Sequence, residues 1–232
     1  MSKIIRLFSG GAAQGLVTAL TPAFKAETGY DIDGTFGAVG AMRERLLAGE
    51  PADLVILTAA LIRNLAADGV VLADGAADLG EVQTSIAVRE GDGVPQITDG
   101  ASLRAALLAS DEIYLPDPEK ATAGIHFAGV LDRLGLGTAV KERLRPFPNG
   151  ATAMAALARS AGRSPIGCTQ VTEILATPGL RLVGHLPAGF DLATVYTAAP
   201  CTAASHPAAA QELIRQLSSP DASKARAMAG FS

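Results

Sequence analysis

The sequence predicts an α/β fold built on parallel strands. The first half of the chain alternates short apolar runs with segments of helical periodicity, and small residues separate them. Apolar residues make up 49% of the 232 residues, whereas aromatic residues make up only 4%. Alanine and glycine therefore carry much of the packing, which fits close contact between helices and a sheet. A chain of this length can form one or two domains and bury a large core.

Three strand–helix pairs open the chain, and each strand ends in a small or hydroxyl residue. Because ligands of an open parallel sheet bind outside the carboxyl ends of its strands, we expect Ser9–Ala13, Gly37–Gly40 and Thr58 to gather at one edge. The predicted strands are Ile4–Phe8, Tyr30–Phe36 and Leu54–Leu57, and the predicted helices are Gly15–Thr28, Ala41–Ala48 and Ala59–Asp68.

The pattern becomes less regular after residue 78, although strands and helices still follow each other. The predicted strands are Val82–Val88, Glu112–Leu115, Ser164–Thr169, Leu180–Leu186 and Ala193–Ala198, with Arg145–Pro148 as a short extended link. The predicted helices are Ser102–Leu108, Thr122–Leu134, Val140–Leu144, Thr152–Ala161, Val171–Leu175, Pro207–Leu217 and Ala222–Ala229.

The first strand–helix turn is a candidate anion site. Gly10 and Gly11 let the backbone approach a ligand closely, and the helix that follows offers free N–H groups and a positive dipole end. The alternative is a plain turn that uses glycine for its geometry, and such turns are common in α/β proteins that bind nothing there.

Several classes of function are disfavoured. A net charge of −4 without a basic stripe argues against a nucleic-acid partner. No apolar run reaches the roughly 18 residues needed to span a membrane, so no membrane insertion is expected. The two cysteines, Cys168 and Cys201, are predicted to be buried free thiols. The three histidines lack metal-ligand spacing, and the sequence predicts neither a metal nor a cofactor.

The N-terminus leads directly into the first strand, without the apolar segment of a signal peptide. A cytoplasmic location is expected if Met1 is the native start, and a periplasmic one if a leader has been removed.

The chain resembles the periplasmic molybdate-binding proteins and their relatives, the two-lobed type II solute-binding proteins. The resemblance covers nearly the whole length. It rests on Leu7–Phe24, on Phe36–Met42, on Ala48-Gly49-Glu50-Pro51-Ala52-Asp53-Leu54, on Asp117-Pro118-Glu119 with Ala123-Gly124-Ile125, and on Ile166-Gly167 before Cys168-Thr169-Gln170.

The resemblance implies two lobes, each a mainly parallel sheet flanked by helices, joined by two crossing strands near Val82–Val88 and Leu192–Pro200. Lobe one would comprise residues 1–84 and 196–232, and lobe two residues 85–195. The ligand would lie between the lobes, which close around it by hinge motion. An ABC transporter would be a partner if the protein is exported.

The departures from the family pattern point away from molybdate. The positions of two serine hydroxyls in the family's oxyanion pocket match Ala12 and Val39 here, and a tyrosine hydroxyl matches Gln170. Losing such donors to a desolvated dianion costs about 1–3 kcal/mol each. The backbone N–H groups of Ala12, Val39, Ala123 and Ala151 do not depend on side chains and would still serve a planar carboxylate.

Arg43 and His126 are the charged or titratable candidates. Arg43 follows the second loop and could hold a carboxylate through two hydrogen bonds, or it could be a solvated helix charge like Arg45. His126 follows Ala123-Gly124 and could contact an anion or carry a proton as a catalytic residue; otherwise it is an ordinary helix histidine. The predicted ligand-binding residues are Ser9, Gly10, Gly11, Ala12, Ala13, Ala38, Val39, Arg43, Thr58, Thr122, Ala123, Ala151, Thr169 and Gln170.

The sequence thus favours a solute-binding protein that captures a small anionic solute, a carboxylate rather than molybdate. The alternative is a cytoplasmic isomerase of a di- or tricarboxylate on the same scaffold, since some relatives of the family are aconitate isomerases. A cytoplasmic ligand sensor is a weaker reading, because the sequence shows no output domain.

Overall fold

The computed structural model describes residues 3–232, which divide into two compact units. Unit 1 comprises residues 3–82 and Thr194–Ser232, and unit 2 comprises Gln83–Ala193. These boundaries lie within two residues of those that the resemblance implied. The predicted α/β class with parallel strands is confirmed. The placement of a ligand between the lobes and the hinge motion stay predictions.

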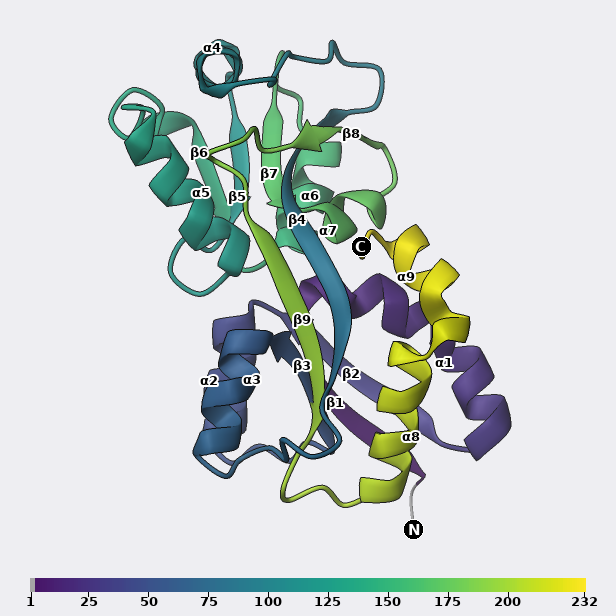
Figure 1. The fold of residues 1–232 in the computed structure, drawn as a ribbon. Coiled ribbons are helices and arrows are strands. Elements are labelled where there is room, and N and C mark those ends of the chain that lie inside the picture. The colour runs from purple at the N-terminus through teal and green to yellow at the C-terminus, as the bar shows by residue number, and fades with distance from the viewer. Residues whose placement is uncertain (1–2) are drawn as a thin grey trace. The chain divides into compact units, whose positions relative to one another are not determined.

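Unit 1 is a sheet with helices on both faces, in the strand order β2-β1-β3-β9-β4 (Figure 1). Strands β1, β2 and β3 run parallel, and β9 runs antiparallel to β3. Helices α2 and α3 cover one face, and α1, α8 and α9 cover the other. The elements are β1 (Ile4–Gly10), the 3-10 turn η1 (Gly11–Ala13), α1 (Gln14–Thr28), β2 (Asp31–Gly37), α2 (Val39–Leu47), β3 (Leu54–Thr58), α3 (Ala59–Ala67), the first half of β4 (Ala77–Arg89), β9 (Ala193–Pro200), α8 (Pro207–Ser218), η3 (Pro220–Ala222) and α9 (Ser223–Ala229).

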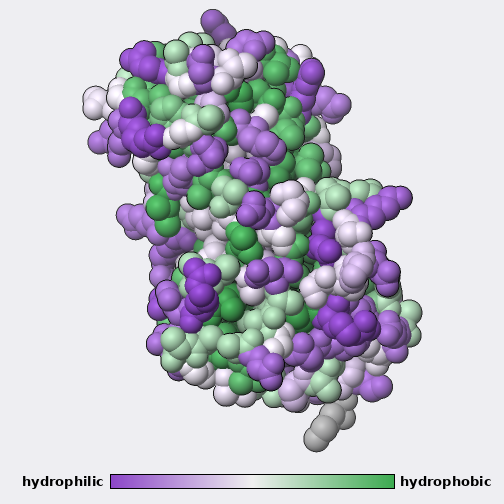
Figure 2. Space-filling model, viewed as in Figure 1, coloured by the Kyte–Doolittle hydropathy of each residue, from purple (hydrophilic) through white to green (hydrophobic). Residues whose placement is uncertain are grey.

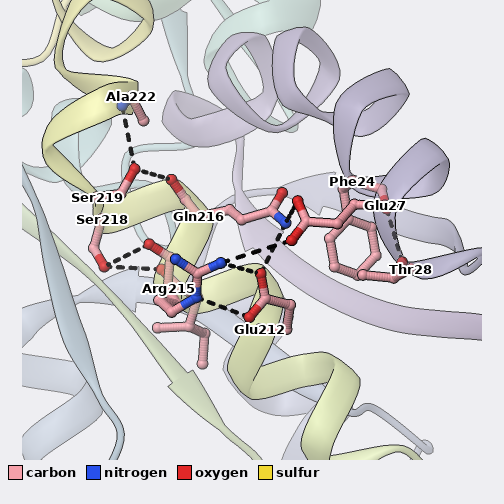
Figure 3. A network of polar contacts seen from close by, with 10 residues as sticks. Phe24, Glu27, Thr28, Glu212, Arg215, Gln216, Ser218, Ser219 and Ala222 are labelled. Atoms are coloured by element: carbon pink, nitrogen blue, oxygen red, sulfur yellow. Dashed lines mark hydrogen bonds and ion pairs between the residues drawn. The ribbon is translucent and has the colours of Figure 1, made fainter.

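A polar network joins α1 to α8 on the surface of unit 1 (Figure 3). Gln216 Nε2 donates to Glu27 Oε2 at 2.9 Å, and Arg215 lies 3.9 Å from the other oxygen of Glu27. These side chains are largely exposed, and exposed ion pairs contribute at most about 1 kcal/mol. The packing of α1 against α8 therefore depends on buried apolar residues, such as Phe24 and Leu213.

Unit 2 also has helices on both faces of its sheet, in the order β4-β7-β5-β6 with β8 paired to β4. Strands β7, β5 and β6 are parallel, and β4 is antiparallel to β7. One apolar core lies under α4 and α5 and another under α6 and α7. The remaining elements are α4 (Gly100–Ala109), β5 (Ile113–Pro116), α5 (Thr122–Arg133), η2 (Lys141–Arg143), β6 (Leu144–Phe147), α6 (Gly150–Ala158), β7 (Ile166–Gln170), α7 (Val171–Leu175) and β8 (Leu180–His185).

Several boundaries differ from the sequence-based expectation. Strand β4 begins at Ala77 instead of Val82, α6 spans Gly150–Ala158 instead of residues 152–161, and only Lys141–Arg143 of the expected helix 140–144 is helical, as a 3-10 turn. Strand β1 continues through Ser9 and Gly10 because these residues pair with Phe36 and Gly37 of β2. Helix α2 begins at Val39, so Gly40 lies in its first turn instead of in a loop. The expected link 145–148 is part of β6, which pairs with β5.

Asp53, from the Gly49–Leu54 motif, ties three segments of unit 1 together. Its carboxylate accepts the backbone N–H of Arg6 and that of His206, each at 2.8 Å. Its own N–H donates to the Arg6 carbonyl at 2.8 Å, and its carbonyl accepts the N–H of Cys201 at 2.9 Å. A residue that is only 3% exposed thus connects β1, the start of β3, the end of β9 and the start of α8.

The visible surface mixes hydrophilic and hydrophobic residues over each unit (Figure 2). Large apolar side chains that are exposed, such as Leu47, Ile125 and Met228, come from separate helices. Scattered exposed apolar residues of this kind are normal. Within residues 3–232, none of the helices is both long and apolar enough to cross a bilayer.

We predict that Asp53→Ala destabilises the protein by about 3 kcal/mol, because two backbone N–H donors lose a buried, charged acceptor, and each such loss costs roughly 1–3 kcal/mol. Urea unfolding measures the difference. The control is Asp74→Ala, at an exposed turn position, which should change stability by less than about 0.5 kcal/mol. Equal stabilities for the two variants would contradict the structural role of Asp53.

Candidate functional site

The helix starts in the described chain differ in their capping, and several, including those of α7 and α8, have no side-chain cap. Helices α3, α4 and α6 are capped by the side chains of Thr58, Asp99 and Asn149. The starts of η1, α2 and α5 have no side-chain cap within residues 3–232. Two of them follow the parallel strands β1 and β2, and the third follows β5 in unit 2. The first N–H groups of a helix need an acceptor from outside the helix, and an anion is a suitable one.

The uncapped starts in unit 1 carry the predicted residues Ala12, Ala13, Ala38 and Val39, and all four are buried. Their side chains are apolar, so any donor to an anion here is a backbone N–H. Thr58, also predicted to bind the ligand, instead accepts the N–H of Leu61 at 3.4 Å as the cap of α3.

Gly10 is required by the packing of unit 1. A Cβ at this position would lie 2.8 Å from Val39 Cγ1 and 2.9 Å from Tyr196 Cε1. The fully buried Ser9 donates its hydroxyl hydrogen to the Gly10 carbonyl at 2.9 Å. In this structure the Ser9 hydrogen is thus directed at the backbone, and a role for Ser9 as a donor to a ligand stays a prediction.

Arg43 and Arg45 differ in a way that the sequence does not show. Arg45 is paired with Glu50 at 2.5 Å, and its guanidinium lies 4.6 Å from the centre of the Phe8 ring. Arg43 is half-buried, and its Nε is buried without a hydrogen-bond partner among the described residues. Arg43 lies in the second turn of α2, four residues after its uncapped start.

The start of α5 is packed closely against the preceding strand. A Cβ on Gly124 would overlap the carbonyl oxygens of Pro116 and Asp117, which explains the glycine of the Ala123-Gly124 motif. The predicted residues Thr122 and Ala123 occupy the first two positions of this helix, and Ala123 is buried.

His126 is held by the backbone. Its Nε2 lies 2.7 Å from the carbonyl oxygen of Phe190. A carbonyl only accepts hydrogen bonds, so Nε2 carries the proton, and Nδ1 of a neutral ring keeps its lone pair. The side chain is half-buried.

The end of β7 carries polar atoms without partners. Gln170 is 3% exposed, and its Oε1 and Nε2 both lack a hydrogen-bond partner within the described part of the chain. The same holds for the buried hydroxyls of Thr84 and Thr172. Natural proteins leave few buried polar groups unpaired, so such a cluster marks a place for a ligand or for water.

Glu173 is a buried carboxyl group that the sequence analysis did not identify. Thr169 donates its hydroxyl to Glu173 Oε2 at 2.5 Å. Burial raises the pKa of Glu173 to about 7, although the Thr169 hydroxyl and the backbone N–H groups of Ala151, Gln170 and Gly150 act to lower it. The predicted donors Thr169 and Ala151 therefore face an internal carboxyl group here, and their contact with a ligand stays a prediction.

The place of Glu173 also explains a glycine. A Cβ on Gly150 would overlap the Glu173 carboxyl and the Thr169 hydroxyl. The sequence does show an acidic residue in a short apolar helix, three positions after Gln170. It does not show that this residue packs against Gly150, which lies 23 residues earlier.

Across residues 3–232, no group of three or more histidine, cysteine, aspartate or glutamate side chains is placed to hold a metal ion. Both cysteines are buried and free within that range, as predicted.

Comparison with known proteins identifies similar chains. The profile of a family described as bacterial extracellular solute-binding protein matches residues 5–232. An aconitate isomerase from a Pseudomonas species is 29% identical over 227 residues, which are 95% of this chain and 84% of the relative. The molybdate-binding protein ModA of Escherichia coli is 24% identical over 185 residues, which are 79% of this chain and 71% of the relative.

The periplasmic molybdate-binding protein of Azotobacter vinelandii has a similar solved structure, with a TM-score of 0.80 and 18% identity over 98% of both chains. This likeness, together with the two compact units, confirms the two-lobed type II fold.

We predict that Glu173 makes stability fall with rising pH. A folded-state pKa near 7 lies above the usual value of 4.5, so the folded protein binds the proton more tightly. Its stabilising contribution is complete below about pH 4.5 and is lost as the pH rises to about 7, a change of up to roughly 3 kcal/mol.

Urea unfolding at pH 5 and pH 8 tests this. Glu173→Gln should lose less stability between the two pH values than the unchanged protein, whereas Glu119→Gln, on an exposed loop, should behave like the unchanged protein. Parallel pH dependences for all three proteins would show that Glu173 titrates normally.

Proposed function

Because the chain belongs to the bacterial extracellular solute-binding protein family, we propose that it binds a small organic carboxylate. Backbone N–H groups at the starts of η1, α2 and α5 bind the carboxylate oxygens, and Arg43 pairs with one carboxylate. The observation that carries this proposal is the buried Nε of Arg43, which has no partner among residues 3–232 and belongs to the second turn of a helix whose start has no side-chain cap.

The choice of a carboxylate over molybdate follows from the donor set. Ala12 and Val39 have apolar side chains at positions where the resemblance to the molybdate-binding proteins implies serine hydroxyls, and Gln170 stands where it implies a tyrosine. A tetrahedral dianion would lose about 1–3 kcal/mol for each missing donor. A planar guanidinium donates two parallel hydrogen bonds to one carboxylate. A carboxylate bound in this way does not need the missing serine and tyrosine hydroxyls.

Calorimetric titration with citrate, malate, succinate, molybdate and sulfate tests the proposal. We expect at least one carboxylate to bind with micromolar or tighter affinity and molybdate to bind at least tenfold more weakly. Nanomolar binding of molybdate would contradict it.

We further predict that Arg43→Met weakens carboxylate binding by roughly 1.5–3 kcal/mol, or about 10- to 100-fold in Kd, because a hydrogen-bonded charge is lost. The matched control is Arg63→Met, on the exposed surface of α3, which should leave Kd unchanged. Equal affinities of the two variants would remove Arg43 from the site.

A second candidate function is isomerisation of an unsaturated tricarboxylate, and the aconitate isomerase relative favours it. Such a reaction needs a base that removes a proton from carbon and an acid that returns one. The free lone pair of His126 Nδ1 has the chemistry of that base in the half-buried start of α5.

Incubation with cis- and trans-aconitate, followed by NMR, distinguishes binding from turnover. If the protein is an isomerase, the two isomers interconvert, and His126→Gln slows turnover by about 100-fold or more while changing substrate affinity little. The control is His206→Gln. No interconversion by the unchanged protein would rule out this function and leave the binding proposal intact.

A further inference from the structure

Thr84 and Gln170 form the last cross-strand pair between β4 and β7. They are Cα partners in an antiparallel ladder, so their side chains lie on the same face of the sheet. Thr84 is fully buried, and Gln170 is 3% exposed. The two residues thus form one small polar surface inside unit 2.

This surface lies on the side of the sheet that α5 covers. The next pair on the same face, Ile86 and Cys168, belongs to the apolar core that includes Phe127 of α5. Strand β7 runs parallel to β5 with Tyr114 opposite Gly167. Continuing that register places Gln170 level with Asp117, where the chain leaves β5 to begin α5.

Three atoms of this surface lack hydrogen-bond partners in the described chain, namely Gln170 Oε1, Gln170 Nε2 and Thr84 Oγ1. A buried polar atom that is left unpaired loses its hydrogen bonds to water without replacement, which destabilises the folded protein. Both atoms of the Gln170 amide are unpaired, so the conclusion is the same whichever way the amide is turned. An occupant that satisfies the amide must therefore accept one hydrogen bond and donate another.

A fully ionised carboxylate or oxyanion only accepts hydrogen bonds and leaves Oε1 unpaired. A hydroxyl group next to a carboxylate supplies both functions. Resting on the carboxylate proposal above, we propose that unit 2 selects hydroxycarboxylates: the ligand hydroxyl donates to Gln170 Oε1, and a carboxylate oxygen accepts from Gln170 Nε2. Thr84 Oγ1 provides a further polar contact on the same face.

Matched ligand pairs test this inference in calorimetric titrations at pH 8, where carboxyl groups are ionised and the hydroxyl is the only donor. The pairs are malate with succinate and citrate with propane-1,2,3-tricarboxylate, and aconitate is a third probe without a hydroxyl. The unchanged protein should bind the hydroxylated member of a pair at least tenfold more tightly than its partner.

Gln170→Met keeps the size of the side chain and removes both polar atoms, so it should reduce that ratio to less than threefold. Gln96→Met, at an exposed position of the same unit, should keep the full ratio. Thermal melting shows that each variant is folded. Thr84→Val, which removes only the hydroxyl, is the second variant and should lower the affinity for the hydroxylated member of each pair.

Each outcome has a defined meaning. Equal binding of both members by the unchanged protein overturns the inference and leaves the carboxylate proposal standing. Binding of molybdate with no binding of any carboxylate overturns both. A ratio that persists in folded Gln170→Met also overturns the inference, because the preference for the hydroxylated ligand would then not come from the Gln170 amide. If Gln170→Met does not fold, the ratio in the unchanged protein and the effect of Thr84→Val decide.

Discussion

The need of helix starts for hydrogen-bond acceptors is the constraint on which the proposed site depends. The first N–H groups of a helix have no partner within the helix, and a buried start must find an acceptor elsewhere. Helices α3, α4 and α6 use their own side chains for this. Within residues 3–232, η1, α2 and α5 do not, although they begin with the buried residues Ala12, Val39 and Ala123. In the proposed site, an external anion is the acceptor for these donors, and this needs no specific side chain.

In the proposed site, that division separates the donors that the fold fixes from those that the side chains supply. Backbone donors are fixed by the strands that end before each helix, so they persist when side chains are replaced. Under the proposal, Arg43 adds a planar charged donor and Gln170 adds one donor and one acceptor, whereas Ala12 and Val39 add none. The proposed preference for a carboxylate therefore rests on a few side chains, and the helix starts themselves favour negative charge.

Much of the fold could be predicted from the sequence because periodicity and glycine positions are local signals. Segments such as Leu54–Thr58 and Val171–Leu175 need only their own residues to be recognised. The errors arose where a distant strand decides. Ser9 and Gly10 are strand residues only because β2 lies beside them, and residues 145–147 are a strand only because β5 does.

The candidate site shows the same limit. Arg43 and Arg45 look equivalent in the sequence, and only the place of Glu50 and Phe8 separates them. His126 could not be assigned a proton position without Phe190, which lies 64 residues away. The unpaired state of Gln170 and the burial of Glu173 depend on the residues packed around them, so neither can be predicted from one segment of the sequence.

Thr169 and Gln170 show how one strand end serves two purposes. Successive strand residues point to opposite faces, so Thr169 lies toward α6 and Gln170 toward α5. On the α6 face, Thr169 holds the Glu173 carboxyl group against the first N–H groups of that helix. An external anion that reached Ala151 would have to displace this group or meet it in its protonated form. On the α5 face the amide of Gln170 is unpaired among the described residues, and the Asp117 carboxylate accepts the N–H groups of Glu119 and Lys120 just ahead of the helix. Of the starts of α5 and α6, that of α6 already holds an internal carboxyl group, so the proposed ligand contacts in unit 2 are placed at α5.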